Sequence, residues 1–161
     1  MGVLVSRYSG RNRIATSFLH RIQDQPRLGL GISTEYGASR SSGALDVHEA
    51  HRRKPQFTQF LEVGVEASKG LDDDARMWSS EGLPTTFHFL DINLDEPEDF
   101  DSEWLNRVRE LAEVLDPAWM CGDAGLWHFG PRDRGHMLLL PPILTDSAAS
   151  AMAEGLVRLS S

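Results

Sequence analysis

Hydrophobic and polar positions show two patterns along this chain from about residue 28 onward, one typical of strands and one typical of helices. Short apolar runs, rich in β-branched or aromatic residues and bounded by Gly or Pro, are typical of buried strands. Four such runs are found, over residues 28–33, 60–66, 85–93 and 118–121. Their regular spacing, with one run every 25–33 residues, leaves room for a helix in each interval.

Helical periodicity fills the intervals between these runs. Apolar residues recur on one helical face over residues 102–115 and again over 146–159, and weaker patterns cover 44–54 and 71–80. The acidic run 72–74 stands at a helix start, where carboxylates are favourable, so we interpret it as a cap rather than a metal site.

Alternating strands and helices predict βαβ units and a parallel sheet, and hence an α/β fold. The chain of 161 residues is long enough for one domain with about four such units. Four units fit either a small doubly wound sheet or the first half of a (β/α)₈ barrel. Residues 1–27 hold five arginines and one acid, and we expect them to form a poorly ordered extension before a domain over 28–161.

Charge and cysteine content narrow the function classes. The net charge is −8, divided into +5 over residues 1–54 and −13 over 55–161, and an acidic body disfavours nucleic acid. Cys121 is the single cysteine, which excludes an internal disulfide and a multi-cysteine zinc site. No apolar run reaches the ~18–20 residues that a membrane span needs, and no continuous apolar stretch typical of a secretory signal follows the basic start. We therefore expect a cytoplasmic protein with no membrane partner.

Polar residues in the strand-like runs are the candidate chemistry, because strands of a parallel sheet are buried on both faces. Glu62, Glu66, His88 and Asp91 break that rule, and Asp123 follows the fourth run. A lone histidine in a strand is more often a hydrogen-bonded core residue, and a glutamate at a strand end belongs to a salt bridge about as often as to a site.

Three consecutive strand ends deliver Glu66, His88 and Asp123 to one rim, with His128 or His136 within reach on a loop. Carboxylate and imidazole ligands together suit iron, manganese or zinc. Arg132 and Arg134 follow on the same loop and could hold a carboxylate of a substrate.

The order of these segments resembles the DUF692 family, the multinuclear non-heme iron-dependent oxidative enzymes. The resemblance rests on five segments: Leu28–Gly31 (LGLG), Phe60–Glu66 (FLEVGVE), Phe87–Phe89 (FHF), Pro117–Asp123 (PAWMCGD) and His136–Pro142 (HMLLLPP). It implies a TIM barrel of the xylose-isomerase-like superfamily, of which this chain would form about the first four β/α units.

The resemblance also implies a function. Members hold two or three iron ions at the top of the barrel and use O₂ to oxidise cysteine-containing peptides, often with a partner protein that presents the peptide. Position by position, the metal ligands implied here are Glu66, His88, Asp123 and His136.

Three departures from the family pattern keep alternatives open. Gly64, Ala67 and Ala124 stand where the family has His, Asn and His. They favour a second hypothesis, a non-catalytic interaction module that pairs with a partner or with itself as a homo-oligomer. A truncated or fragmentary family member, and a divalent-metal sugar isomerase or nuclease of the same superfamily, are the other readings.

Overall fold

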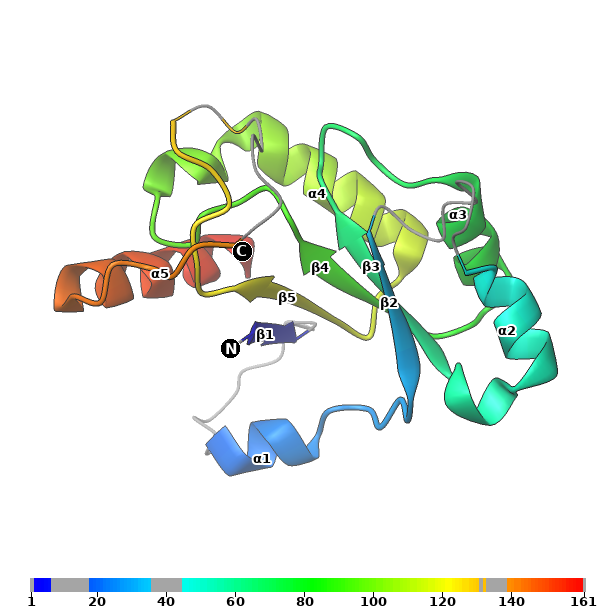
Figure 1. Ribbon diagram of the computed structural model, residues 1–161. Coiled ribbons are helices and arrows are strands. Elements are labelled where there is room, and N and C mark those ends of the chain that lie inside the picture. The colour runs from blue at the N-terminus through cyan, green and yellow to red at the C-terminus, as the bar shows by residue number, and fades with distance from the viewer. Residues whose placement is uncertain (1, 7–17, 36–44, 131, 133–138, 161) are drawn as a thin grey trace.

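The protein is an α/β structure whose strands and helices alternate, as the computed structural model in Figure 1 shows. The structure describes residues 2–6, 18–35, 45–130, 132 and 139–160. The four consecutive parallel strands are β2 (Gly31–Glu35), β3 (Phe60–Val65), β4 (Thr85–Phe89) and β5 (Trp119–Asp123). The helices between them are α2 (Val47–Arg53), α3 (Asp73–Ser80) and α4 (Ser102–Leu115). The predicted α/β class and parallel sheet are confirmed.

A fifth strand comes from the basic N-terminal segment. Strand β1 (Gly2–Ser6) pairs antiparallel with β5, so the strand order is β1-β5-β4-β3-β2, and α1 (Phe18–Gln23) follows it. Part of the segment predicted as a poorly ordered extension thus belongs to the sheet. The physical reason is the edge of β5, whose backbone N–H and C=O groups need a partner that β1 supplies.

Aspartate and threonine caps fix where the helices begin. Asp72 accepts a hydrogen bond from the Ala75 N–H at 2.9 Å, which confirms that the acidic run caps α3. Thr145 caps α5 (Asp146–Leu159) in the same way through the Ala148 N–H. Helix α4 ends at Leu115, and its C-cap residue Asp116 adopts a left-handed conformation with φ 47° before Pro117, which cannot continue a helix. Local chemistry therefore accounts for these boundaries.

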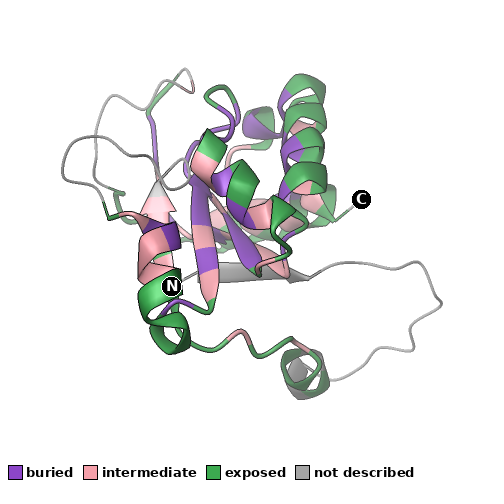
Figure 2. Cartoon of the chain, turned by 90° about the vertical axis from the view of Figure 1, so that its right-hand side faces the viewer, coloured by how far each residue is buried: buried purple, intermediate pink, exposed green. Residues whose placement is uncertain are grey.

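The two faces of the sheet differ in polarity because side chains alternate along a strand. Toward the helices the strands contribute Leu61, Val63, Val65, Phe87 and Phe89, which are almost fully buried with Trp78, Trp104 and Leu111 of the helices. Figure 2 shows this buried layer on the strands and on the inner sides of the helices. The opposite face carries polar groups, among them Glu62, His88 and Asp123, and is called the polar face below.

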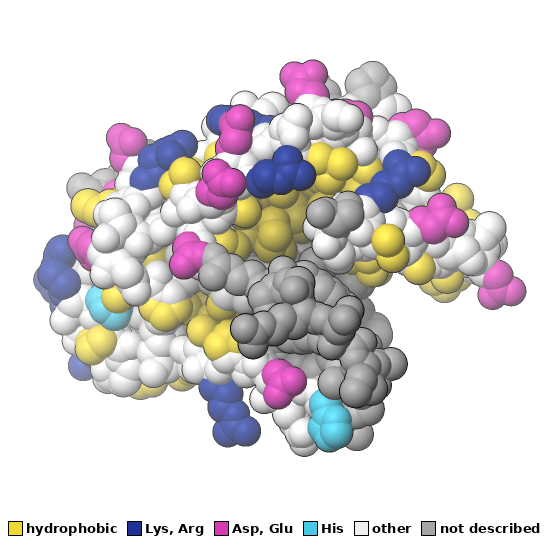
Figure 3. All heavy atoms as spheres, turned by 180° about the vertical axis from the view of Figure 1, so that it is seen from behind, with side chains coloured by type: hydrophobic (Ala, Val, Ile, Leu, Met, Phe, Trp, Pro, Cys, Tyr) yellow, Lys and Arg dark blue, Asp and Glu magenta, His cyan; other side chains and the backbone are white. Residues whose placement is uncertain are grey.

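The surface mixes both signs of charge. Seen from behind, acidic and basic side chains are interspersed around the upper edge, with hydrophobic side chains between them (Figure 3).

Within the described ranges, no helix combines the length and apolar character required to cross a membrane.

Helix α5 packs on the short 3₁₀ helix η2 (Pro97–Phe100), which lies in the connection between β4 and α4. Gly155 is the contact point, and it is the one buried residue of α5. A Cβ at this position would lie 2.5 Å from Phe100 Cζ and 2.7 Å from the Leu94 carbonyl oxygen. Glycine is required there because the helix backbone approaches this turn closely.

We predict that Gly155→Ala destabilises the protein although alanine is the better helix former by about 1 kcal/mol. The added methyl group must displace the buried Phe100 ring or α5 itself, at a cost of about 1–3 kcal/mol. Urea unfolding followed by far-UV circular dichroism measures the change. Ala153→Gly, on the exposed side of the same helix, is the control for helix propensity alone. A more stable Gly155→Ala protein would contradict the close packing.

Candidate functional site

Polar side chains gather at the carboxyl ends of β3, β4 and β5, the edge at which parallel α/β sheets place their chemistry. Glu66 follows β3, Asp91 follows β4, and Asp123 ends β5. All three acids are at least three-quarters buried. The connections after β4 and β5 add further acids and a histidine, so this rim concentrates ionisable groups.

His88 and Asp123 meet on the polar face. The His88 Nε2 atom lies 2.9 Å from Asp123 Oδ2 on the neighbouring strand, and Nδ1 lies 4.0 Å from Glu62 Oε1 on the other side. The Ser33 hydroxyl donates to the same Glu62 oxygen at 2.7 Å. The imidazole therefore stands between two carboxylates. All three side chains keep between a fifth and a third of their surface accessible.

Glu66 makes different contacts. Its Oε2 forms an ion pair with Lys69 at 2.8 Å, one turn further along the chain. Among the described residues, Glu66, His88 and Asp123 do not form a group whose three ligand atoms lie within 4.8 Å of one another. His136 lies outside the residues that the structure describes. The structure brings together His88 and Asp123 of the predicted ligand set.

Asp91 serves the structure of the rim. Its Oδ2 accepts hydrogen bonds from the Ala67 N–H at 2.7 Å and from the Trp104 indole N–H at 3.2 Å. Its Oδ1 is buried with no hydrogen-bond partner. Burial raises the pKa of Asp91 against the opposing effect of these hydrogen bonds. Asp91 thus joins the end of β3 to the start of α4.

Arg132 lies against the connection that follows β4. Its guanidinium donates to the Asp99 carbonyl and to Asp101 Oδ2, and stands 5.3 Å from the centre of the Trp104 ring. Arg134 lies outside the described residues. The position of Arg132 near the rim is compatible with binding a carboxylate, but that ligand would have to compete with Asp101.

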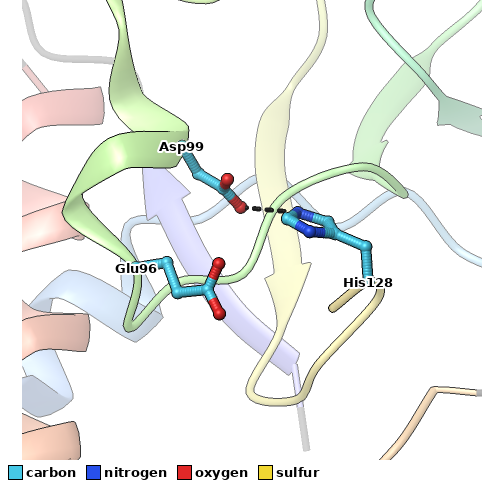
Figure 4. A group of neighbouring side chains, drawn as sticks. All are labelled: Glu96, Asp99 and His128. Atoms are coloured by element: carbon cyan, nitrogen blue, oxygen red, sulfur yellow. Dashed lines mark hydrogen bonds and ion pairs between the residues drawn. The ribbon is translucent and has the colours of Figure 1, made fainter. Parts of the chain in front are cut away.

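A second cluster at the rim consists of Glu96, Asp99 and His128, whose ligand atoms all lie within 4.8 Å of one another (Figure 4). Glu96 directly precedes η2 and Asp99 lies within it, and residues three apart lie above one another in a 3₁₀ helix. His128 comes from the connection after β5, and its Nε2 is 2.9 Å from Asp99 Oδ2. The sequence pattern predicted His128 as an alternative ligand but not Glu96 or Asp99, whose one sequence signal is the E-x-x-D spacing before α4.

Asn93 holds this cluster in place. Its side-chain oxygen accepts from the Trp127 N–H at 2.6 Å, and its side-chain nitrogen donates to the His128 carbonyl at 2.9 Å. Its backbone N–H donates to Asp99 Oδ2 at 2.6 Å. A single fully buried residue therefore fixes both connections relative to each other.

No family model, no curated protein and no solved structure matches this chain. The site has to be judged on its own geometry.

Cys121 is next to His88 across the β4–β5 ladder, which raises the question of a thiol nucleophile. Burial, reinforced by the negative charges of Glu62 and Asp123, raises the pKa of the Cys121 thiol to about 12. At pH 8 roughly one thiol in 10⁴ would be ionised. This environment suppresses nucleophilic chemistry at the sulfur.

We therefore predict that iodoacetamide alkylates Cys121 at pH 8 at least ~100-fold more slowly in the native protein than in urea. Glu62→Gln removes one of the negative charges and should speed the native reaction. Because Cys121 is the single cysteine, mass spectrometry of the intact protein reports its alkylation directly. Equal rates in native and unfolded protein would show that the thiol is not protected.

Proposed function

We propose that this protein is a divergent relative of the multinuclear non-heme iron-dependent oxidative enzymes, and that it binds iron on the polar face of its sheet. The observation that carries the proposal is the contact between His88 Nε2 and Asp123 Oδ2 at 2.9 Å. These two residues are implied as ligands by the family resemblance, and they come from neighbouring strands separated by 35 positions in the sequence.

The order of the strands supports the proposal. Four parallel strands follow one another in space as they do in the sequence, with one helix in each interval, as in successive units of a barrel. In a barrel the helices lie outside, so the polar face would correspond to the interior. A histidine and two carboxylates on that face would then point into the barrel.

The fit to iron is partial within the described residues. His88 and Asp123 offer one nitrogen and one oxygen ligand atom, both suited to ferrous or ferric iron. Glu66 is held by Lys69, so it would have to leave that ion pair to join them. His136 remains the predicted additional ligand. Bound iron would supply the activation of O₂ for oxidation of a thiolate in a peptide substrate.

The residues around His88 orient its ring. The Ser33 hydroxyl donates to Glu62, and this carboxylate lies near Nδ1, so Nε2 is directed to Asp123. Such partners on the far side of an imidazole fix which nitrogen is available to a metal. We assign Ser33 and Glu62 a positioning role.

A second candidate function is an interaction module without catalysis. It is favoured by large apolar side chains exposed around α5: Leu144 is 90% exposed, Val157 70% and Ile143 66%. Such a patch is typical of a surface that meets another protein. Under this hypothesis His88 and Asp123 form an ion pair and nothing more.

The decisive experiment compares iron content after anaerobic reconstitution with Fe²⁺ and desalting. We predict that His88→Ala retains at least one iron ion fewer per chain than the wild type, with an unchanged far-UV dichroism spectrum. Asp123→Asn should have the same effect, because it removes the second ligand.

His20→Ala is the matched control, since it makes the same chemical change at an exposed histidine of α1. Full iron retention in His88→Ala would disprove the metal site on the polar face. Iron-free wild-type protein that elutes as an oligomer would favour the interaction module.

A further inference from the structure

We propose that Glu96, Asp99 and His128 form a separate binding site for a divalent transition-metal ion at the rim. None of these residues belongs to the set on the polar face. They come from the connections after β4 and β5, whereas His88 and Asp123 lie within the strands. The inference therefore stands or falls independently of the proposed function.

The first argument is the protonation of His128. Its Nδ1 lies 2.8 Å from the Gly130 carbonyl oxygen, and a carbonyl can only accept, so Nδ1 carries the proton. In the neutral ring Nε2 then carries a lone pair, and this nitrogen faces Asp99 Oδ2 at a distance of 2.9 Å. Two lone pairs at this distance repel each other unless a cation lies between them. The site requires either an additional proton or a metal ion.

The second argument is the surroundings of the two atoms. The side chains of His128 and Asp99 are 1% and 8% exposed, so water cannot relieve the repulsion. The hydrogen bond from Nδ1 to a backbone carbonyl is the arrangement that metal-binding histidines commonly show, because it fixes the ring and leaves Nε2 free to coordinate. Asp99 Oδ2 is likewise fixed by the Asn93 N–H.

Glu96 supplies the third ligand. Its carboxylate makes no hydrogen bond or ion pair with another described residue, and it points toward the other two side chains in Figure 4. It is also only partly buried, which gives an ion a path to the site.

The chemistry of the three side chains indicates the kind of ion. One imidazole and two carboxylates suit Mn²⁺ or Fe²⁺, with water in the remaining positions.

Among the described residues, Arg132 forms an ion pair with one of the proposed ligands. Its Nε is 4.0 Å from Asp99 Oδ1, the oxygen that does not face His128, and its Nη2 donates both to the Asp99 carbonyl and to Asp101 Oδ2. The guanidinium therefore balances part of the negative charge of Asp99 and leaves Oδ2 to the ion. Glu96, Asp99 and the ion would then approach electrical neutrality together with Arg132 and Asp101.

Isothermal titration of chelator-treated protein with Mn²⁺ at pH 7.5 tests the site. We expect Glu96→Gln to lower the affinity for one equivalent of Mn²⁺ by at least ~10-fold, because a direct ligand is lost. Mn²⁺ should also raise the Tm of the wild type but not that of the variant.

Glu98→Gln is the matched control, as it removes the same charge from an exposed residue of η2 two positions away. Glu96→Gln is preferred to a change at His128 because its partly exposed carboxylate supports no recorded contact, so the variant should fold. His88→Ala should bind this Mn²⁺ equivalent like the wild type, which separates the two sites. Absence of Mn²⁺ binding, or equal binding by Glu96→Gln and the wild type, would overturn the proposal.

Discussion

Hydrogen bonds join the connections that follow β4 and β5 at the carboxyl edge of this sheet. Asn93 uses its backbone N–H and both polar atoms of its side chain to bind Asp99, Trp127 and His128. All of these groups are buried or nearly so, where an unmade hydrogen bond costs about 1–3 kcal/mol. Loss of any partner would therefore loosen both connections together. The positions of Glu96, His128 and Arg132 all depend on this arrangement.

Helix α5 completes that arrangement from outside. It contacts η2 through Gly155, and Arg158 donates to the Pro97 carbonyl at 3.1 Å. The turn that carries Glu96 and Asp99 is thus held between Asn93 on one side and α5 on the other. A rigid turn is what a binding site needs, because ligands that are already in place lose little conformational freedom on binding.

The two sets of histidine and carboxylate groups show different balances of charge. On the polar face, His88 lies between Asp123 and Glu62 with partial access to solvent, which moderates the cost of unpaired charge. At the rim, Asp99 and His128 are almost completely buried, and their charges must be balanced within the protein. Burial therefore favours a cation more strongly at the rim than on the polar face. The rim cluster is also the one that the pattern of strands and helices did not predict.

Most of the strands and helices after residue 28 could be predicted from the sequence alone. Helices α4 and α5 begin and end at the residues that their apolar periodicity and capping residues predict, because those signals are local. The β-branched and aromatic runs likewise predicted β3 and β4, and with them the parallel sheet. The sequence also predicted that His88 and Asp123 lie at the same edge of the sheet, because consecutive parallel strands align their carboxyl ends.

Contacts between segments far apart in the sequence could be seen only in the folded structure, because strand patterns do not encode them. Pairing of β1 with β5 joins segments more than 100 residues apart, and a five-residue run has no sequence signal that names its partner. The cluster of Glu96, Asp99 and His128 arises from two irregular connections, where no periodicity relates one residue to another. Glu66 lies at the predicted strand end, yet its contact with Lys69 depends on the path of the turn that follows. Periodicity thus fixes the elements, while long-range packing selects which polar groups meet.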